Sequence, residues 1–209
     1  MAEERAIVAR RSLWREFRLA AGMPKEKDCV PKVVPIRQSQ VGSAKVFADR
    51  YTYIASLPQG AVCAEVGVKE GNFSNFILEN AKPQRLHLIC QSITRYKVRE
   101  RFADNPIVEC HEGDSSTLLK TFPDGTFDWI YLDAGHSYAS VSADVRAAGP
   151  KLKPNGLLVF NDYVLYSYKE GHFYGVVQAV NELCESGWQV EAFCLSPNMH
   201  CDIAVRRPD

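Results

Sequence analysis

The stretch Ala61-Val-Cys-Ala-Glu-Val-Gly-Val-Lys-Glu-Gly71 joins a predicted buried strand to a predicted helix. Its first six residues are apolar apart from Glu65, and Gly67 and Gly71 follow. The next residues, Asn72-Phe-Ser-Asn-Phe-Ile-Leu78, have helical periodicity in their apolar side chains. Glycines let the backbone pass close to a ligand, and a helix start offers free N–H groups. The stretch therefore predicts either a ligand site or an ordinary strand-to-helix turn.

The composition limits the classes of protein to which the chain can belong. The 209 residues fit one α/β domain with short additions, and 46% of them are hydrophobic, which permits a sizeable core. The 25 Lys and Arg residues balance the 25 Asp and Glu residues, so the formal net charge is zero. This balance argues against broad electrostatic binding to nucleic acid or to an anionic membrane. We expect no nucleic-acid partner and no membrane partner.

The seven cysteines favour a reducing compartment. They are scattered without a CxxC pair, which argues against a Cys-rich zinc site. An odd number of cysteines without a secretory signal indicates reduced thiols, and we expect a cytoplasmic location. No apolar run approaches the roughly 20 residues that a membrane-spanning helix needs.

Residues 1–42 are predicted to form an N-terminal helix and a connector, ahead of a larger domain over residues 43–209. The helix over residues 1–22 has one apolar face and several arginines on its other faces. We expect this helix to pack on its own domain or on a second subunit, which would give a homo-oligomer. The alternative is a helix that binds a membrane interface or a partner. Prolines break residues 23–37, and Ser43 is predicted to cap a helix that continues through Ser56.

Predicted strands alternate with predicted helices through the rest of the chain. The strands cover residues 61–66, 85–90, 107–111, 127–133, 157–160, 188–195 and 201–205. A hairpin turn joins the last two. This order predicts a doubly wound, mostly parallel seven-stranded sheet with helices on both faces and an antiparallel C-terminal hairpin strand.

Polar residues follow several of these strands at the point where each strand ends. They are Glu65, Asp114, Asp133 and the pair Asn161-Asp162. In open α/β sheets, ligands bind at the carboxyl ends of the strands near the switch point of the topology. We therefore expect these side chains to converge on one cleft.

The motifs and their order resemble the class I S-adenosylmethionine-dependent methyltransferases over about residues 40–209. Glu65-Val-Gly-Val-Lys-Glu-Gly71 is similar to the acid-x-Gly-x-x-x-Gly form of the catechol O-methyltransferase-like and macrolide-sugar O-methyltransferase groups. Three later stretches resemble the macrolide-sugar group: Phe127-Asp-Trp-Ile-Tyr-Leu-Asp133, Gly135-His-Ser-Tyr138 and Lys151-Leu-Lys-Pro-Asn-Gly156. Leu157 departs from the pattern, because relatives often carry a second glycine there. The resemblance implies a Rossmann-like methyltransferase domain over residues 43–209.

The resemblance also implies a set of residues that bind S-adenosylmethionine (SAM). Glu65 would face the methionine end of the cofactor, and Gly67 and Gly71 would let the backbone approach it. The segment Gly113-Asp114-Ser115 would meet the adenine, with Asp114 accepting from its amine. Asp133 also belongs to this set.

The expected ribose-binding position departs from the family. Relatives usually hold the ribose hydroxyls with an acid after the second strand, and this chain has Cys90-Gln91 there. Gln91 could bind a hydroxyl, but an uncharged acceptor is weaker than a carboxylate. This difference keeps open a degenerate or altered cofactor site.

The resemblance further implies a metal site and a catalytic base. Asp133, Asn161 and Asp162 match the positions where relatives hold a divalent cation, and oxygen ligands suit Mg²⁺. The alternative is that these side chains cap helices or bond within the loops. His136 lies where relatives carry a Lys or His base, and an imidazole can take a proton near neutral pH. The alternative is a structural histidine.

These observations predict a SAM-dependent O-methyltransferase that acts on a hydroxyl of a small molecule or sugar. The altered end of the second strand keeps open a non-catalytic or degenerate Rossmann-like binding protein. A nicotinamide-dependent oxidoreductase is the third alternative, but it predicts GxGxxG after the first strand, which this chain lacks. The sequence does not identify the acceptor.

Overall fold

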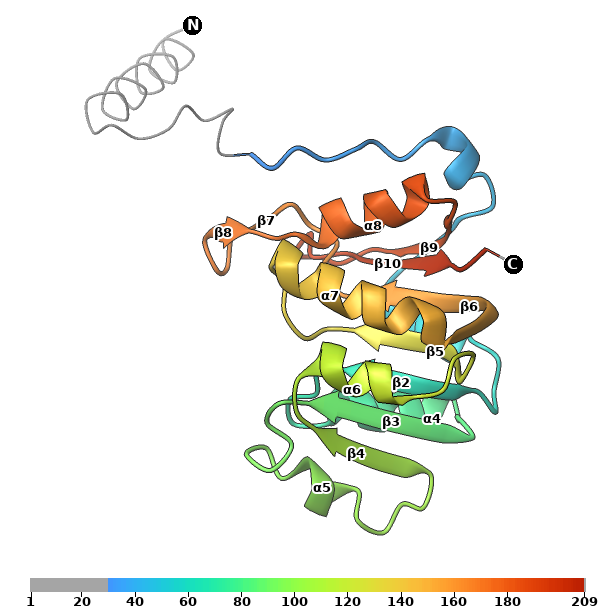
Figure 1. The fold of residues 1–209 in the computed structure, drawn as a ribbon, viewed down its shortest axis with the longest axis vertical. Helices are drawn as coiled ribbons and strands as arrows, with labels where there is room; N and C mark the ends of the chain where they lie inside the picture. Colours follow the sequence, from blue (N-terminus) through green and yellow to red (C-terminus); the bar gives the residue numbers. More distant parts are fainter. Residues whose placement is uncertain (1–29, 209) are drawn as a thin grey trace, which may run out of the picture. The chain divides into compact units, whose positions relative to one another are not determined.

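The computed structural model describes residues 30–208 of the chain. Internal contacts divide the chain into a short N-terminal unit, residues 1–32, and a large unit, residues 33–209. The helices and strands of the described residues all lie in the large unit (Figure 1). The predictions of a helix over residues 1–22 and of oligomerisation through it lie outside the described residues.

The large unit is built on an eight-stranded sheet in the order β1-β9-β10-β6-β5-β2-β3-β4. Its strands are β1 (Lys45–Phe47), β2 (Val62–Val66), β3 (Arg85–Cys90), β4 (Val108–Glu112), β5 (Phe127–Leu132), β6 (Leu152–Phe160), β9 (Gln189–Cys194) and β10 (Asp202–Arg206). Strand β10 runs antiparallel to β6 and β9, and the remaining neighbours pair in parallel. The predicted doubly wound fold with an antiparallel C-terminal strand is confirmed.

The eighth strand, β1, corrects the predictions of seven strands and of a helix beginning at Ser43. Residues 45–47 extend the sheet, with Val46 opposite Phe193 of β9. Helix α3 (Arg50–Ala55) begins only after Asp49, whose carboxylate accepts from the backbone N–H of Thr52 at 2.7 Å. Asp49 thus provides the N-cap that was assigned to Ser43. Local periodicity did not reveal the strand, because its pairing partner lies far away in the sequence.

Helices cover both faces of the sheet. On one face lie α6 (Ser115–Thr121), α7 (Tyr138–Ala148) and α8 (Val176–Glu185), which Figure 1 shows in front of the strands. The other face carries α3, α4 (Asn72–Asn80) and α5 (Val98–Arg101). Two short 3₁₀ turns, Gln38–Gln40 and Gly149–Lys151, and a small hairpin of β7 (Tyr166–Ser167) and β8 (His172–Phe173) complete the described elements.

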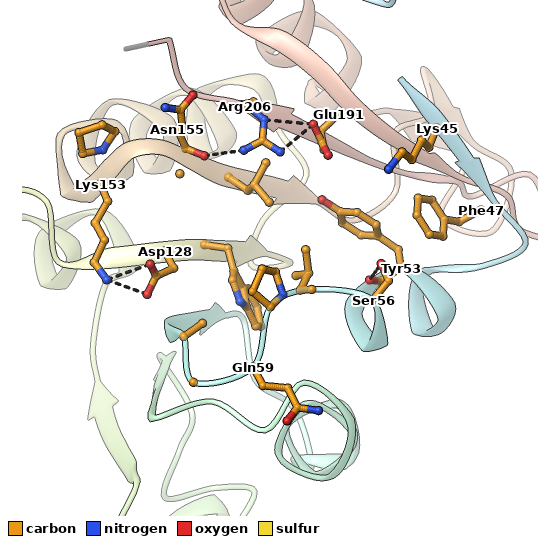
Figure 2. A pocket seen from close by; sticks show the side chains of 18 residues that line it. Lys45, Phe47, Tyr53, Ser56, Gln59, Asp128, Lys153, Asn155, Glu191 and Arg206 are labelled. Carbon is orange, nitrogen blue, oxygen red and sulfur yellow. Dashed lines mark hydrogen bonds and ion pairs between the residues drawn. The ribbon is translucent and has the colours of Figure 1, made fainter. Parts of the chain in front are cut away.

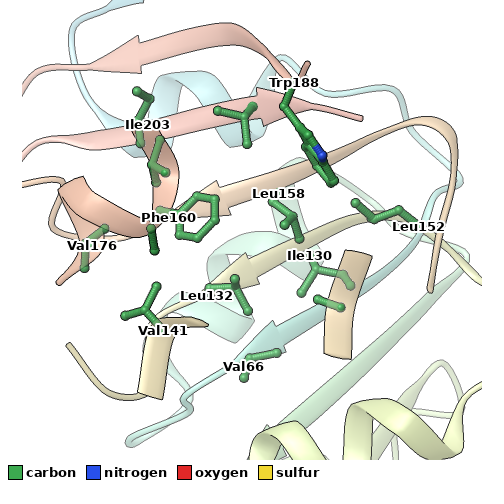
Figure 3. Packing of buried hydrophobic residues seen from close by; sticks show 14 of the residues in the cluster. Val66, Ile130, Leu132, Val141, Leu152, Leu158, Phe160, Val176, Trp188 and Ile203 are labelled. Atoms are coloured by element: carbon green, nitrogen blue, oxygen red, sulfur yellow. The ribbon is translucent and has the colours of Figure 1, made fainter. Parts of the chain in front are cut away.

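The central strands are buried from both sides, which explains their continuous apolar runs. Ile130 of β5 and Leu158 of β6 are fully buried on the face of α7 and α8, where Figure 3 shows them with Val141 and Val176. Tyr131 of β5 belongs instead to the core on the opposite face. Burial of each large apolar side chain contributes roughly 1.5–3 kcal/mol, so these strands form a firm base for the loops at their ends.

The topology reverses between β2 and β5. From β2 the chain moves outward through β3 to β4, then returns to β5 beside β2 and continues through β6 in the other direction. The carboxyl ends of β2 and β5 therefore flank the switch point, where ligands bind in such sheets. Among residues 30–208, no helix combines the length and the apolar character needed to cross a bilayer.

Candidate functional site

Two pockets adjoin at the switch point, and Asp133 lies in the wall of both. The first, which we call the strand-end pocket, has a volume of about 480 Å³ and lies at the ends of β2, β3, β4 and β5. The second, which we call the acidic pocket, has a volume of about 520 Å³. A ligand in one pocket would therefore lie next to a ligand in the other.

The walls of the two pockets contain most of the residues singled out in the sequence. Those of the strand-end pocket are Gly67, Gln91, Gly113, Asp114, Ser115 and Asp133. Those of the acidic pocket are Asp133, Asn161 and Asp162, together with Arg50, His200 and Asp202, which were not predicted. Distant strand ends thus meet at one edge of the sheet. Glu65, Gly71 and His136 are absent from both walls, and His136 lines a separate small cavity of about 10 Å³.

The two glycines in the stretch from Glu65 to Gly71 are required for different reasons. Gly67 lines the strand-end pocket with a φ of 96°, and a Cβ added there would lie 2.0 Å from the backbone oxygen of Asp133. The end of β2 thus packs directly against the backbone that follows β5. Gly71 precedes α4 with a φ of 77°, and an added Cβ would lie 2.8 Å from the ring of Phe102. Gly71 therefore shapes the start of α4, outside the pocket wall.

Asp114 and Ser115 are held in place at the start of α6. Asp114 Oδ1 accepts from the backbone N–H of Thr117 at 2.8 Å and from the Ser116 hydroxyl at 2.9 Å. The hydrogen bonds from Thr117 lower the pKa of Asp114, so its carboxylate is charged at neutral pH. Ser115 donates to Asp144 at 2.6 Å. Asp114 is thus both the cap of α6 and a part of the pocket wall.

Gln91 follows β3 and contributes an exposed amide to the wall of the strand-end pocket. The preceding Cys90 donates its thiol to the backbone oxygen of Val68 at 2.8 Å, which ties the end of β3 to the loop after β2. The position that bears an acid in relatives therefore holds a side chain that can both donate and accept hydrogen bonds.

Glu65 is the penultimate residue of β2 and lies in the core beneath the switch point. It is 4% exposed and accepts from the Ser74 hydroxyl of α4 at 2.5 Å. Burial raises the pKa of Glu65 to about 8, and the hydrogen bond from Ser74 opposes the rise. The resemblance implied that Glu65 contacts the cofactor directly. Glu65, however, lies in neither pocket wall.

Asn161 connects Asp133 to a half-buried arginine. Its amide nitrogen donates to Asp133 Oδ1 at 2.9 Å, while its amide oxygen accepts from Arg50 at 2.9 Å. Burial raises the pKa of Asp133 to about 7, and the charge of Arg50 opposes this rise. These hydrogen bonds fix the orientation of the Asn161 amide.

Arg50 is a candidate functional residue that the sequence did not reveal. It begins α3 and places its guanidinium carbon 4.8 Å from the centre of the Phe73 ring and 5.2 Å from that of Tyr51. It also donates to the Tyr131 hydroxyl at 3.1 Å. The incorrect helix boundary concealed it, since a helix over residues 43–56 places Arg50 in mid-helix. Arg50 brings a positive charge to a pocket rich in carboxylates.

The predicted Mg²⁺ ligands do not fit a cation as they are arranged. The side-chain oxygen of Asn161 already accepts from Arg50, and its nitrogen is directed at Asp133. Among the residues that the structure describes, the acids and imidazoles of this pocket form no group of three whose ligand atoms lie within 4.8 Å of one another. The guanidinium of Arg50 further disfavours a second cation beside it.

Two histidines approach Asp162 from different parts of the chain. His136 Nε2 lies 3.7 Å from Asp133 Oδ1 and 4.0 Å from Asp162 Oδ2. His200 Nδ1 lies 3.0 Å from Asp162 Oδ2. Both Nε2 atoms are buried without a hydrogen-bond partner among residues 30–208. Burial lowers the pKa of His136, which favours the neutral imidazole.

The loop between β6 and α8 packs on these histidines. Tyr174 is buried and stacks on His136 with ring centres 4.4 Å apart, and it meets His200 edge to face. Tyr166 and Tyr168, in contrast, are exposed. The tyrosine-rich loop is therefore divided between side chains that pack on the site and side chains that face solvent.

A third pocket, of about 510 Å³, lies near the amino ends of β2 and β5. Figure 2 shows two ion pairs in its wall, Lys153 with Asp128 and Arg206 with Glu191, each at 2.8 Å. It shares no wall residue with the two pockets at the switch point. The predicted site residues therefore lie elsewhere.

Comparison with known proteins shows similarity to methyltransferases. Residues 64–163 match a family model described as a methyltransferase domain. No curated protein matches the chain. The structure of the N-methyltransferase NodS from Bradyrhizobium japonicum WM9 has a TM-score of 0.57 at 18% identity, covering 77% of this chain and 95% of that one.

Two further solved structures have a similar fold. An O-methyltransferase family protein from Burkholderia thailandensis has a TM-score of 0.58 at 12% identity, covering 76% of this chain and 55% of that one. The tRNA methyltransferase TrmK from B. subtilis has a TM-score of 0.55 at 17% identity, covering 78% and 67%. These comparisons show that the large unit has the methyltransferase fold that the motifs predicted, and that residues 64–163 match a methyltransferase domain.

Proposed function

We propose that the protein transfers the methyl group of SAM to a hydroxyl of a small molecule or sugar. The observation that carries this proposal is the position of Asp133 in the wall of both pockets. It supports a cofactor in the strand-end pocket and an acceptor in the acidic pocket, separated by one residue. Holding two reactants next to each other supplies a large part of the catalysis of group transfer.

The strand-end pocket has the chemistry to hold the cofactor. Asp114 offers a fixed carboxylate for an amine, Gln91 offers an amide for ribose hydroxyls, and Gly67 leaves the wall without a side chain. The bound cofactor would supply a methyl group on a positively charged sulfur. The carboxyl of Glu65, buried beneath this edge, would favour a positive charge above it when ionised.

The imidazoles favour a hydroxyl acceptor. A hydroxyl must lose its proton as the methyl group is transferred, and a neutral histidine can accept that proton. We assign this role to His136, which lies beside the shared Asp133. His200 is the competing base, since Asp162 holds its Nδ1 and leaves Nε2 to accept.

The acidic pocket argues against a nucleic-acid acceptor. Asp133, Asp162 and Asp202 would repel a phosphate backbone, and the chain has no net positive charge to offset this repulsion. An amine acceptor is the second candidate function, because the same carboxylates attract ammonium groups. The similarity of the fold to the N-methyltransferase NodS is compatible with that candidate.

Calorimetry with S-adenosylhomocysteine, with NAD as the control ligand, tests the cofactor assignment. We expect the first to bind and the second not to bind. Binding of neither ligand would favour the binding-protein alternative, and binding of NAD alone would favour an oxidoreductase.

A screen of hydroxyl and amine acceptors with methyl-labelled SAM tests the reaction. Labelling of hydroxyl compounds supports the proposal. We expect Asp162→Asn to reduce this labelling, because the variant loses the charge that faces both histidines. Labelling of amines alone would contradict the proposal and favour the second candidate.

A further inference from the structure

Two histidines and a glutamate cluster at the outer edge of the sheet, away from both pockets of the switch point. His87 of β3 lies directly opposite Glu109 of β4, and His111 follows Glu109 by two residues, on the same face of the strand. His87 Nδ1 lies 3.0 Å from His111 Nε2 and 3.5 Å from Glu109 Oε2. His111 Nε2 lies 4.0 Å from the same oxygen. Three potential ligand atoms thus face one another.

The spacing of these atoms suits a small divalent metal ion. In a tetrahedral zinc site, bonds of about 2.0–2.1 Å to nitrogen and oxygen place the ligand atoms about 3.3 Å apart. The three distances in the cluster bracket this value. Among the described residues, this is the one cluster of three or more acidic, histidine or cysteine side chains whose ligand atoms all lie within 4.8 Å of one another. Small rotations of the side chains would equalise the distances.

The surroundings hold the potential ligands in place. Arg85 pairs with Glu109 Oε1 at 2.5 Å, which leaves Oε2 on the side of the histidines. The ring of His87 packs edge to face on Phe122 and Phe127. Hydrogen bonds behind ligands and apolar walls around them are typical of metal sites in proteins.

The cluster also has a route to solvent. The side chain of His87 is 9% exposed, whereas those of His111 and Glu109 are 26% and 43% exposed. Strand β4 lies at the edge of the sheet and pairs only with β3 among the described strands. An ion can therefore enter without displacing the core.

We propose that His87, Glu109 and His111 form a zinc site that links the edge strand β4 to β3. Imidazole and carboxylate ligands suit Zn²⁺, and three protein ligands leave a fourth position for water. Cys90 at the end of β3 and Gly113 directly after β4 line the strand-end pocket. Bound zinc would stabilise the part of the sheet that carries one side of that pocket.

The test uses the whole chain without an affinity tag, stripped of metal with a chelator and then dialysed. Competition with a chromophoric chelator measures the affinity for Zn²⁺, and the ring signals of histidines in nitrogen NMR spectra report which imidazoles bind. We expect one equivalent to bind with shifts at His87 and His111, and His111→Ala to weaken binding more than tenfold. Zinc should also raise the melting temperature of the wild type.

His172→Ala is the matched control, because it removes an exposed histidine from the β7–β8 hairpin. It should bind zinc as the wild type does. Glu109→Gln is a second variant at an exposed position, in case His111→Ala does not fold, and it should also weaken binding. Equal zinc affinity in the wild type, His111→Ala and Glu109→Gln would overturn the proposal. The absence of measurable zinc binding to the wild type would also overturn it. Shifts confined to His136 and His200 would overturn it too, because they place the ion beside Asp162.

Discussion

At the scale of single residues, burial sets the charges in the site and beneath it. Glu65, Asp133 and Asp202 have raised pKa values because each carboxyl is removed from water, and the charge of Arg50 opposes the rise for all three. A buried carboxyl without full compensation holds its proton to higher pH. The interior below the switch point is therefore sensitive to pH.

Replacement of Glu65 by glutamine tests this sensitivity. With a folded pKa of about 8 and an ordinary value of 4.5, the folded protein keeps a proton that the unfolded chain has lost. The contribution of this group to stability is therefore highest below pH 4.5 and falls as the pH rises to about 8. We expect Glu65→Gln to remove about 2–3 kcal/mol of the fall between about pH 6 and pH 8, as measured by urea unfolding. Parallel pH curves for both proteins would contradict the raised pKa.

Kinetics can separate the roles of the two histidines. If His136 is the base, His136→Ala should lower the methyl-transfer rate about 10²–10⁴-fold. The variant should keep its affinity for S-adenosylhomocysteine. Because burial lowers its pKa, the acid limb of the wild-type rate profile should lie below the ordinary histidine value of 6.5. A larger loss in His200→Ala, with a small one in His136→Ala, would transfer the role to His200.

At the scale of elements, the close contact between the ends of β2 and β5 determines the shape of the site. Gly67 lies directly on the backbone of Asp133, so the two strand ends approach more closely than a side chain would allow. The same approach places Asp133 between the two pockets. The glycine of the first motif thus serves packing as much as ligand binding.

Gly67→Ala should be much more harmful than a similar change elsewhere. Gly125 also has a positive φ, of 69°, but nothing lies within 4 Å of a Cβ added there. We expect Gly125→Ala to cost about 1–2 kcal/mol from backbone strain alone. Gly67→Ala adds a collision with backbone and should cost about 3 kcal/mol or more. Chemical unfolding of both variants measures the difference, and equal losses would refute the packing role.

At the scale of the whole molecule, the site joins residues from three distant segments. Arg50 comes from α3, Asp133 follows β5, and His200 precedes β10. Arg50 brings a positive charge to the pocket where the resemblance implied Mg²⁺. The chain itself therefore provides the positive electrostatic contribution beside Asp133.

This arrangement predicts a reaction that does not respond to magnesium. Added Mg²⁺ should leave the rate of dialysed protein unchanged, while Arg50→Met should lower kcat/KM for the acceptor more than tenfold. The effect follows from the loss of a half-buried cation beside Asp133 and Asn161. Binding of S-adenosylhomocysteine by calorimetry is the control for folding. A rate that rises steeply with Mg²⁺ would contradict the prediction.

Local sequence patterns were sufficient for the central strands and their ends. Apolar runs ending in polar residues predicted these strands, and parallel strands bring their carboxyl ends to one edge, so Asp114, Asp133 and Asn161 could be placed together in advance. The short strand β1 and the start of α3 were predicted incorrectly, because β1 forms by pairing with β9, which lies much later in the chain.

The sequence by itself determined the central strands, the class of fold and the strand ends at which polar groups gather, since these follow from periodicity and from the geometry of parallel sheets. Only the tertiary structure decided which side chains meet. It placed Arg50 against Asn161, His200 against Asp162, and Glu65 beneath the site instead of in its wall. Contacts of this kind depend on long-range packing and burial, and neither is encoded in the local pattern of residues.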